Sequence, residues 1–250
     1  MIAARRLMLA MFVAPLLACS STRDPAKPCP SASGVSTESG TDAANCPHQA
    51  TAGYSTTFPG TERPLSDGNS WSTGKSVGLD WNDVQTTPGK AFGADFATGY
   101  NDCIAVLKKS FAPDQYAEGT VHREAGYSPN TSHEIELLLR FQITPHNARG
   151  YEVLWGHTGE VNVVRWNGPL GDYTPLIATS GPNIGAAVDG DVLRAEVVGG
   201  VITVYKNGTR VLTAPSNTTW TDGQPGLGFW PKPGATLGSY GWKKFEAGPL

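Results

Sequence analysis

The chain alternates apolar and polar residues at a period of two over many short stretches, as half-buried strands do. The clearest stretch is 134–142, whose apolar side chains on one face are Ile135, Leu137, Leu139 and Phe141. The opposite face carries Glu136, Arg140 and Gln142. A strict alternation predicts that these three polar side chains point away from the core.

Similar patterns recur between turn residues, and no stretch beyond residue 52 keeps a 3.6-residue apolar period. The further predicted strands are 104–107, 120–124, 151–155, 161–166, 192–198, 201–205, 210–212, 226–230 and 242–245. Asn207-Gly208 predicts a type I′ hairpin turn, because both residues accept a positive φ. About ten strands suffice for two packed sheets, so we predict an all-β fold, a two-sheet antiparallel sandwich.

Composition supports this fold class and narrows the function. The 250 residues include 30 glycines and 19 prolines, and only 16% are charged, which suits a turn-rich β domain better than a coiled coil. The net charge of −3 provides no broad basic surface, so nucleic acid is excluded as a partner. The Gly-x-Ser-x-Gly elbow of serine hydrolases is absent from the sequence.

The N-terminus has the order of an export signal. Arg5 and Arg6 precede an apolar run, 7–17, that is shorter than the roughly 20 residues of a membrane-spanning helix. The following Leu16-Leu17-Ala18-Cys19 resembles the lipobox of bacterial lipoproteins. That resemblance implies removal of 1–18, a palmitate-type lipid on Cys19, and a location in the bacterial cell envelope. A plain secretory signal with a chance cysteine is the alternative.

The sequence predicts a lipidated cysteine and flexible tether over 19–51, followed by one folded domain over 52–250. The tether is rich in Ser, Thr, Pro and Gly and has few large apolar residues. With Cys19 lipidated, three thiols remain. We prefer a Cys29–Cys46 disulfide in an oxidising envelope, with Cys103 as a buried thiol. The alternative is a Cys46–Cys103 bridge.

Three segments, 190–197, 202–208 and 223–229, are similar to the C-terminal half of concanavalin-A-like (laminin-G-like) jelly-roll domains. Upstream, 111–116 and 150–154 also look like that family. The resemblance spans about residues 55 to 246 and implies a jelly-roll sandwich of the lectin and glucanase type. This fold hosts lectins, hydrolases, lyases and adhesion modules, so it does not select a function.

The resemblance also offers a catalytic pattern to compare. Laminarinase-type endoglucanases carry Glu-x-Asp-x-x-Glu or Glu-x-Asp-x-Glu on one strand, and retaining chemistry needs two carboxyl groups about 5–5.5 Å apart. Glu134 and Glu136 have the right spacing, but Leu138 occupies the acid/base position. A lyase-type Gln-Ile-His segment is also incomplete, because Thr144 follows Gln142-Ile143. The sequence therefore leans against catalysis.

Tryptophan suggests a binding surface instead, since its ring can stack on sugar faces and the chain has seven. We place candidate ligand-binding residues on one polar sheet face and its neighbouring loops: His122, Glu136, Arg140, Gln142, Trp155, Arg165 and Trp166. Asp80, Asn82 and Asp83 bring oxygen atoms close together, as Ca²⁺ sites require, with a solvated turn as the alternative. No other cofactor is indicated.

Three functions remain open. The preferred one is a non-catalytic module, glycan-binding or adhesive, held at a membrane by its lipid and facing polysaccharide. The second is a glycoside hydrolase or polysaccharide lyase. The third is a structural or protein-interaction lipoprotein without a sugar ligand. An open groove with exposed aromatic rings favours the first two, and a flat or filled sheet face favours the third.

Overall fold

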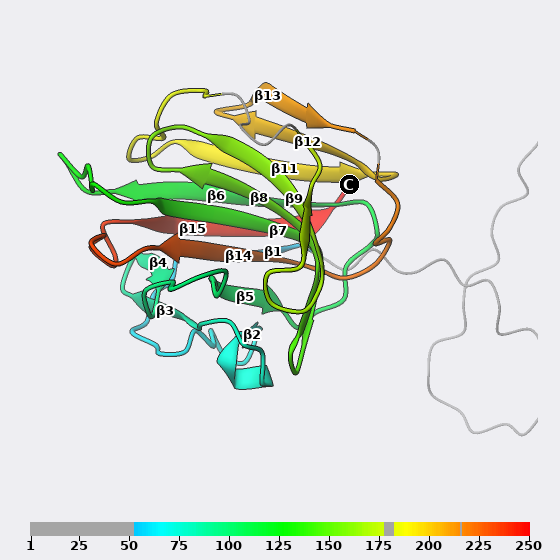
Figure 1. Cartoon of the computed structure of the whole chain (residues 1–250), viewed down its shortest axis with the longest axis horizontal. Helices are drawn as coiled ribbons and strands as arrows, with labels where there is room; N and C mark the ends of the chain where they lie inside the picture. Colours follow the sequence, from blue (N-terminus) through cyan, green and yellow to red (C-terminus); the bar gives the residue numbers. More distant parts are fainter. Residues whose placement is uncertain (1–52, 178–182, 216) are drawn as a thin grey trace, which may run out of the picture. The chain divides into compact units, whose positions relative to one another are not determined.

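The computed structural model describes residues 53–177, 183–215 and 217–250. The export signal, Cys19 and the predicted tether with Cys29 and Cys46 lie outside the described residues. Within these ranges the chain forms two antiparallel sheets packed face to face, with one short 3₁₀ turn and no α-helix (Figure 1). The predicted fold class, an all-β antiparallel sandwich, is confirmed. The described part also has no helix long and apolar enough to cross a membrane.

The first sheet has the strand order β13-β12-β11-β6-β15-β4-β3, with β1 paired to β15. Its strands are β1 (Tyr54–Thr56), β3 (Val84–Thr87), β4 (Lys90–Gly93), β6 (Gln115–Arg123), β11 (Val192–Val198), β12 (Val201–Lys206), β13 (Thr209–Ala214) and β15 (Tyr240–Pro249). Consecutive strands pair as hairpins only in part, so distant segments such as β6 and β15 meet at the centre of this sheet.

The second sheet has the order β10-β9-β8-β7-β14-β5-β2 and carries the site described below. Its strands are β2 (Trp71–Thr73), β5 (Cys103–Leu107), β7 (His133–Thr144), β8 (Asn147–Gly156), β9 (Val161–Gly168), β10 (Tyr173–Pro175) and β14 (Gln224–Pro231). The 3₁₀ turn η1 (Lys75–Val77) follows β2.

The main core lies between the two sheets and is built by alternate residues of each strand. On β7, Ile135, Leu137 and Leu139 are fully buried there, as their alternation predicts. Burying each such side chain stabilises the fold by about 1.5–3 kcal/mol. Cys103 is a free thiol in the same core, which agrees with its interpretation as a buried thiol. Burial raises the pKa of Cys103 to about 12.

The alternation of β7 breaks at Arg140, where the sequence prediction is wrong. Arg140 has a φ of 48°. The register against β8 shifts between Leu139 and Gln142, which marks a β-bulge. Beyond it the faces exchange, so Arg140 is buried and Phe141 leaves the main core. Phe141 packs instead against Trp81, with ring centroids 6.3 Å apart.

Candidate functional site

A second, smaller apolar cluster lies on the outer face of the second sheet. It combines side chains of β5, β7, β8 and β9 with the segment that follows η1. The rings of Trp81 and Trp166 meet at a centroid distance of 4.3 Å. This layer covers part of the outer face and forms one wall of a pocket, because Trp166 also lines that pocket.

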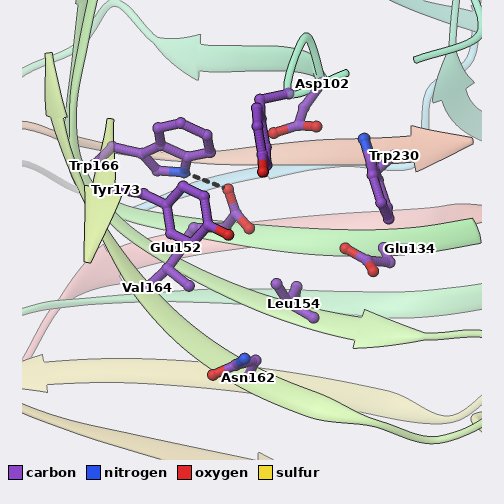
Figure 2. A pocket seen from close by; sticks show the side chains of 10 residues that line it. Asp102, Glu134, Glu152, Leu154, Asn162, Val164, Trp166, Tyr173 and Trp230 are labelled. Atoms are coloured by element: carbon purple, nitrogen blue, oxygen red, sulfur yellow. Dashed lines mark hydrogen bonds between the residues drawn. The ribbon is translucent and has the colours of Figure 1, made fainter. Parts of the chain in front are cut away.

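The pocket has a volume of about 160 Å³ and opens beside this layer. Figure 2 shows its lining, which comprises Tyr100, Asp102, Glu134, Glu152, Leu154, Asn162, Val164, Trp166, Tyr173 and Trp230. The strand contributions sit at every second position, such as 152 and 154 on β8, because alternate side chains share one face of a sheet. Pairing then brings different strands together: Trp230 on β14 lies opposite Glu134 on β7.

The carboxyl groups of Asp102, Glu134 and Glu152 form the floor of the pocket, and Glu136 lies next to two of them. Glu134 and Glu136 come from β7, Glu152 comes from β8, and Asp102 directly precedes β5. The cross-strand register places Glu152 opposite Leu138. The carboxyl oxygens of Asp102, Glu136 and Glu152 all lie within 4.8 Å of one another, and the three residues are buried. We call these three residues the carboxylate cluster.

Burial sets the electrostatics of this floor. It raises the pKa of Glu134 to about 8, with the neighbouring Glu152 adding to the effect. It raises the pKa of Glu152 to about 7, although the Trp166 indole N–H, which donates to Glu152 Oε2 at 2.7 Å, opposes the shift. Burial also raises the pKa values of Asp102 and Glu136 well above their usual range. Within the described ranges, no ion pair involves any of these four carboxyl groups.

Aromatic rings form the rim. The side chains of Tyr100 and Tyr173 are 50% and 37% exposed, and their ring centroids are 5.5 Å apart. Tyr173 also contacts Trp166, at 5.3 Å. Across the pocket, the Trp230 indole N–H donates to the Gly99 carbonyl at 2.8 Å, which fixes its ring. A sugar ring has apolar C–H faces and polar hydroxyl groups. The flat aromatic faces of the rim complement the first, and the hydrogen-bonding carboxyl groups complement the second.

Three residues proposed from the sequence lie elsewhere. His122 is on β6 in the first sheet, 3.5 Å from Lys90 Nζ, so it does not share a sheet with Glu136. Trp155 is buried in the main core. Arg140 points into the sandwich and donates to the Pro113 carbonyl at 2.7 Å, and to the Trp220 carbonyl and Asp114 at 3.2 Å. The prediction that Arg140 faces the polar groove is therefore wrong.

Gln142 and Arg165 also miss the pocket. Gln142 bonds to Asp222 at 2.9 Å and accepts from Arg149, while Arg165 donates to Asn167, Thr219 and Thr174. Of the seven candidates, Trp166 lines the pocket and Glu136 lies in the carboxylate cluster beneath it.

The predicted calcium segment serves separate local contacts. Asp80 pairs with His146 Nδ1 at 2.9 Å. The Asn82 amide donates to the Asn101 carbonyl at 2.9 Å, and Asp83 accepts from the Lys75 backbone N–H at 2.9 Å. Each of the three side chains is thus directed at a different partner.

Comparison with known proteins bears on the fold. No protein-family model and no curated protein matches the chain. Among solved structures it is similar to beta-agarase A in complex with oligoagarose, at 10% identity and a TM-score of 0.51 over 80% of this chain and 92% of that one. Carbohydrate-binding module CBM66 from Bacillus subtilis aligns at 16% identity and a TM-score of 0.47 over 71% and 90%. The fold is a concanavalin-A-like jelly roll.

In this jelly roll the three-acid pattern of the laminarinase-type hydrolases stays incomplete on β7, because Leu138 fills its last position. The third carboxyl group comes instead from Glu152, directly opposite on β8. Sequence reasoning missed Glu152, Asp102 and Tyr173 because nothing in a strand's own pattern reveals which strand will pair beside it.

Proposed function

We propose that this jelly roll binds a neutral saccharide in the outer-face pocket and does not cleave it. The observation that carries the proposal is the aromatic rim, in which Tyr100 and Tyr173 are exposed and Trp230 is partly exposed, beside buried carboxyl groups. The pocket, at about 160 Å³, is smaller than the roughly 300–1,000 Å³ of sites for drug-sized ligands. It therefore suits one sugar ring, with the rest of a glycan outside.

The lining supplies both contacts that a sugar ring needs. The faces of Tyr173 and Trp230 can pack against its C–H groups, while Glu134, Glu152 and the Asn162 amide can accept or donate hydrogen bonds to its hydroxyls. The residues that line the pocket include no lysine or arginine that could pair with a carboxylated or sulfated sugar. Arg140 and Arg165 lie outside this lining, so neither offers a guanidinium group to an acidic sugar, and a neutral sugar fits the pocket better.

The same floor argues against turnover. Retaining hydrolysis requires one carboxylate held ionised beside a protonated partner, so the two environments must push the pKa values apart. Here burial pushes the pKa values of Glu134 and Glu152 in the same direction, to about 8 and about 7. No group in the pocket is held ionised by an ion pair within the described ranges.

Binding of the purified full-length chain to an array of neutral and acidic glycans tests the proposal. Tyr173→Ala and Trp230→Ala should each weaken binding by about threefold to tenfold, since an aromatic stacking contact is worth about 0.5–1.5 kcal/mol beyond the area that it buries. Tyr205→Ala, which removes a partly exposed ring from β12 in the first sheet, is the matched control and should bind normally.

Two outcomes would contradict the proposal. Unchanged binding in both pocket variants would remove the ligand from this site. Accumulation of shorter sugars that Glu134→Gln abolishes would show a hydrolase in place of a binding module.

We also propose that a lipid on Cys19 holds the domain at a membrane of the cell envelope. The support is the order of Arg5-Arg6, the apolar run 7–17 and the Leu16-Leu17-Ala18-Cys19 box. A tethered sugar-binding domain would keep a polysaccharide close to that membrane.

A further inference from the structure

The carboxylate cluster is built from three separate elements of the second sheet. Asp102 precedes β5, Glu136 lies in the middle of β7, and Glu152 lies in β8. Their oxygens gather within 4.8 Å although all three residues are buried. Bringing three acidic groups together away from water is costly unless protons or a cation neutralise them.

Glu136 is the most isolated member. Its side chain is 0% exposed, and within the described residues neither of its carboxyl oxygens has a hydrogen-bond partner. The neighbouring strand makes room for it: a Cβ on Gly228 would lie 2.1 Å from Glu136 Oε2. A buried carboxyl group that has space around it but no hydrogen-bond partner indicates a ligand between it and the neighbouring carboxyl groups.

The protein supplies little to balance this charge. Within the described ranges, the one side-chain donor to the cluster is the Trp166 indole N–H, on Glu152 Oε2. No lysine, arginine or histidine of the described part forms an ion pair with the cluster. What is missing is positive charge.

We propose that Asp102, Glu136 and Glu152 bind a divalent cation, with Ca²⁺ preferred. Carboxylate oxygens are ligands for hard cations, and Ca²⁺ takes them at about 2.3–2.6 Å. The oxygens of the cluster all lie within 4.8 Å of one another, so one ion can bind all three residues. Mg²⁺ is usually held by one or two carboxylates and keeps several waters, so three protein carboxylates favour Ca²⁺.

The cation would sit beneath the pocket, since Asp102 and Glu152 belong to both the cluster and the pocket lining. Ligands beyond the three carboxylates come from water or from a saccharide hydroxyl. Only this last step rests on the proposed sugar binding; the cation site stands on the cluster alone.

The test uses the purified full-length chain, freed of metal with EDTA, and CaCl₂ or MgCl₂ alone as probe. Calorimetric titration should give one saturable site that is at least tenfold tighter for Ca²⁺, and saturation should raise the melting temperature by several degrees. Glu136→Gln keeps the shape of the side chain and should weaken binding at least a hundredfold. If that variant does not fold, Glu152→Gln takes its place.

Asp80→Asn is the matched control. It removes a carboxylate outside the cluster that the sequence made a calcium candidate, and its cation binding should be unchanged. Terbium adds an optical readout: excitation of tryptophan should sensitise bound Tb³⁺, and Trp166→Phe should reduce that emission while Ca²⁺ still competes Tb³⁺ away.

Absence of saturable Ca²⁺ and Mg²⁺ binding would overturn the proposal, and so would binding lost in Asp80→Asn but retained in Glu136→Gln. Failure of the two proposals is separable. Sugar binding by a protein that shows no saturable Ca²⁺ or Mg²⁺ binding removes the cation site alone; cation binding without any glycan ligand removes the saccharide alone.

Discussion

The backbone conformation at one residue of β7 determines which of its polar side chains lie at the pocket and which form contacts that hold the fold. Arg140 and Glu136 are both polar residues of one strand, and both were expected on its solvated face. Glu136 lies beneath the pocket, whereas Arg140 spans the gap between the sheets to contact Pro113 and Asp114 ahead of β6. The difference is the bulge between them, so equal polarity led to opposite environments.

Arg140→Ala should destabilise the domain strongly. The substitution removes the three hydrogen bonds that the buried guanidinium donates and takes from the Pro113 carbonyl its Arg140 donor, whereas the Trp220 carbonyl keeps the Tyr151 hydroxyl at 3.1 Å. We expect a loss of about 3 kcal/mol in the free energy of unfolding, measured by urea denaturation. The exposed Arg210→Ala on β13 is the control and should change it by less than about 0.5 kcal/mol. Equal effects would mean that the network around Arg140 is not stabilising.

His133 should make folding sensitive to acid. Burial lowers its pKa to about 3, from about 6.5 in the unfolded chain, and its Nδ1 lies 2.7 Å from the Tyr127 hydroxyl. Below pH 6.5 the unfolded chain takes up a proton that the folded chain refuses until about pH 3, so stability falls as pH falls through this window. Between pH 8 and pH 5 the loss from this group is about 2 kcal/mol.

The measurement is the difference between wild type and His133→Gln, because buried carboxyl groups titrate in both proteins and cancel. The free energy of unfolding of the wild type should drop relative to the variant as pH falls from 7 to 5. Parallel pH profiles for the two proteins would indicate that the folded histidine protonates normally.

At the scale of elements, turns and registers rather than side-chain polarity shape the molecule. The hairpin between β12 and β13 turns at Asn207 and Gly208, whose φ values are 51° and 75°, as a type I′ turn requires. The Asn207 side chain also accepts from the Val192 N–H at 2.8 Å, which ties the turn to β11. The turn therefore fixes the register of three strands.

Gly208→Val should destabilise this hairpin through backbone conformation alone. A Cβ at Gly208 meets nothing within 4 Å, so no clash contributes, but a β-branched residue strongly resists a φ of 75°. We expect a loss of about 1–3 kcal/mol by chemical denaturation. Thr209→Val, one residue later and at an ordinary φ, should change stability little. A neutral Gly208→Val would show that the turn can relax to another type.

The alternation of single strands was enough to predict the fold class, because ten of the strands are long enough to show a period of two. It missed β1 to β4 and β10, which have only three or four residues each. It also failed at Arg140, where a bulge leaves no mark in the residue pattern. The carboxylate cluster was not predicted for another reason. Glu152 lies near Glu136 because of the register between β7 and β8, and the residue pattern of a single strand does not reveal that register.

At the scale of the whole molecule, the sequence predicts two functions in separate parts of the chain: attachment near Cys19, and recognition on the second sheet. The described structure bears on the second alone. All ten named residues of its pocket lining belong to the described part of the chain. Attachment and binding can therefore be tested independently.

Cys19→Ser should move the protein from the membrane fraction to the soluble fraction, because the lipid thioether cannot form on serine. Cys29→Ser, a matched change within the predicted tether, should leave the protein at the membrane. Cell fractionation with immunoblotting is the measurement. A Cys19→Ser protein that stays with the membrane would mean that attachment does not depend on a lipid at this cysteine.

Because Cys103 is buried, the order of folding and oxidation determines whether its thiol can form a disulfide. Disulfide exchange proceeds through the thiolate, and a pKa of about 12 leaves on the order of one thiol in 10⁵ ionised at pH 7. In the unfolded chain the same thiol is as reactive as any other. We therefore expect folding before oxidation to protect Cys103, and oxidation of the nascent chain to allow its pairing with Cys29 or Cys46 of the predicted tether. Burial in the core of the folded sandwich thus slows disulfide exchange at Cys103 and restricts which cysteines can pair.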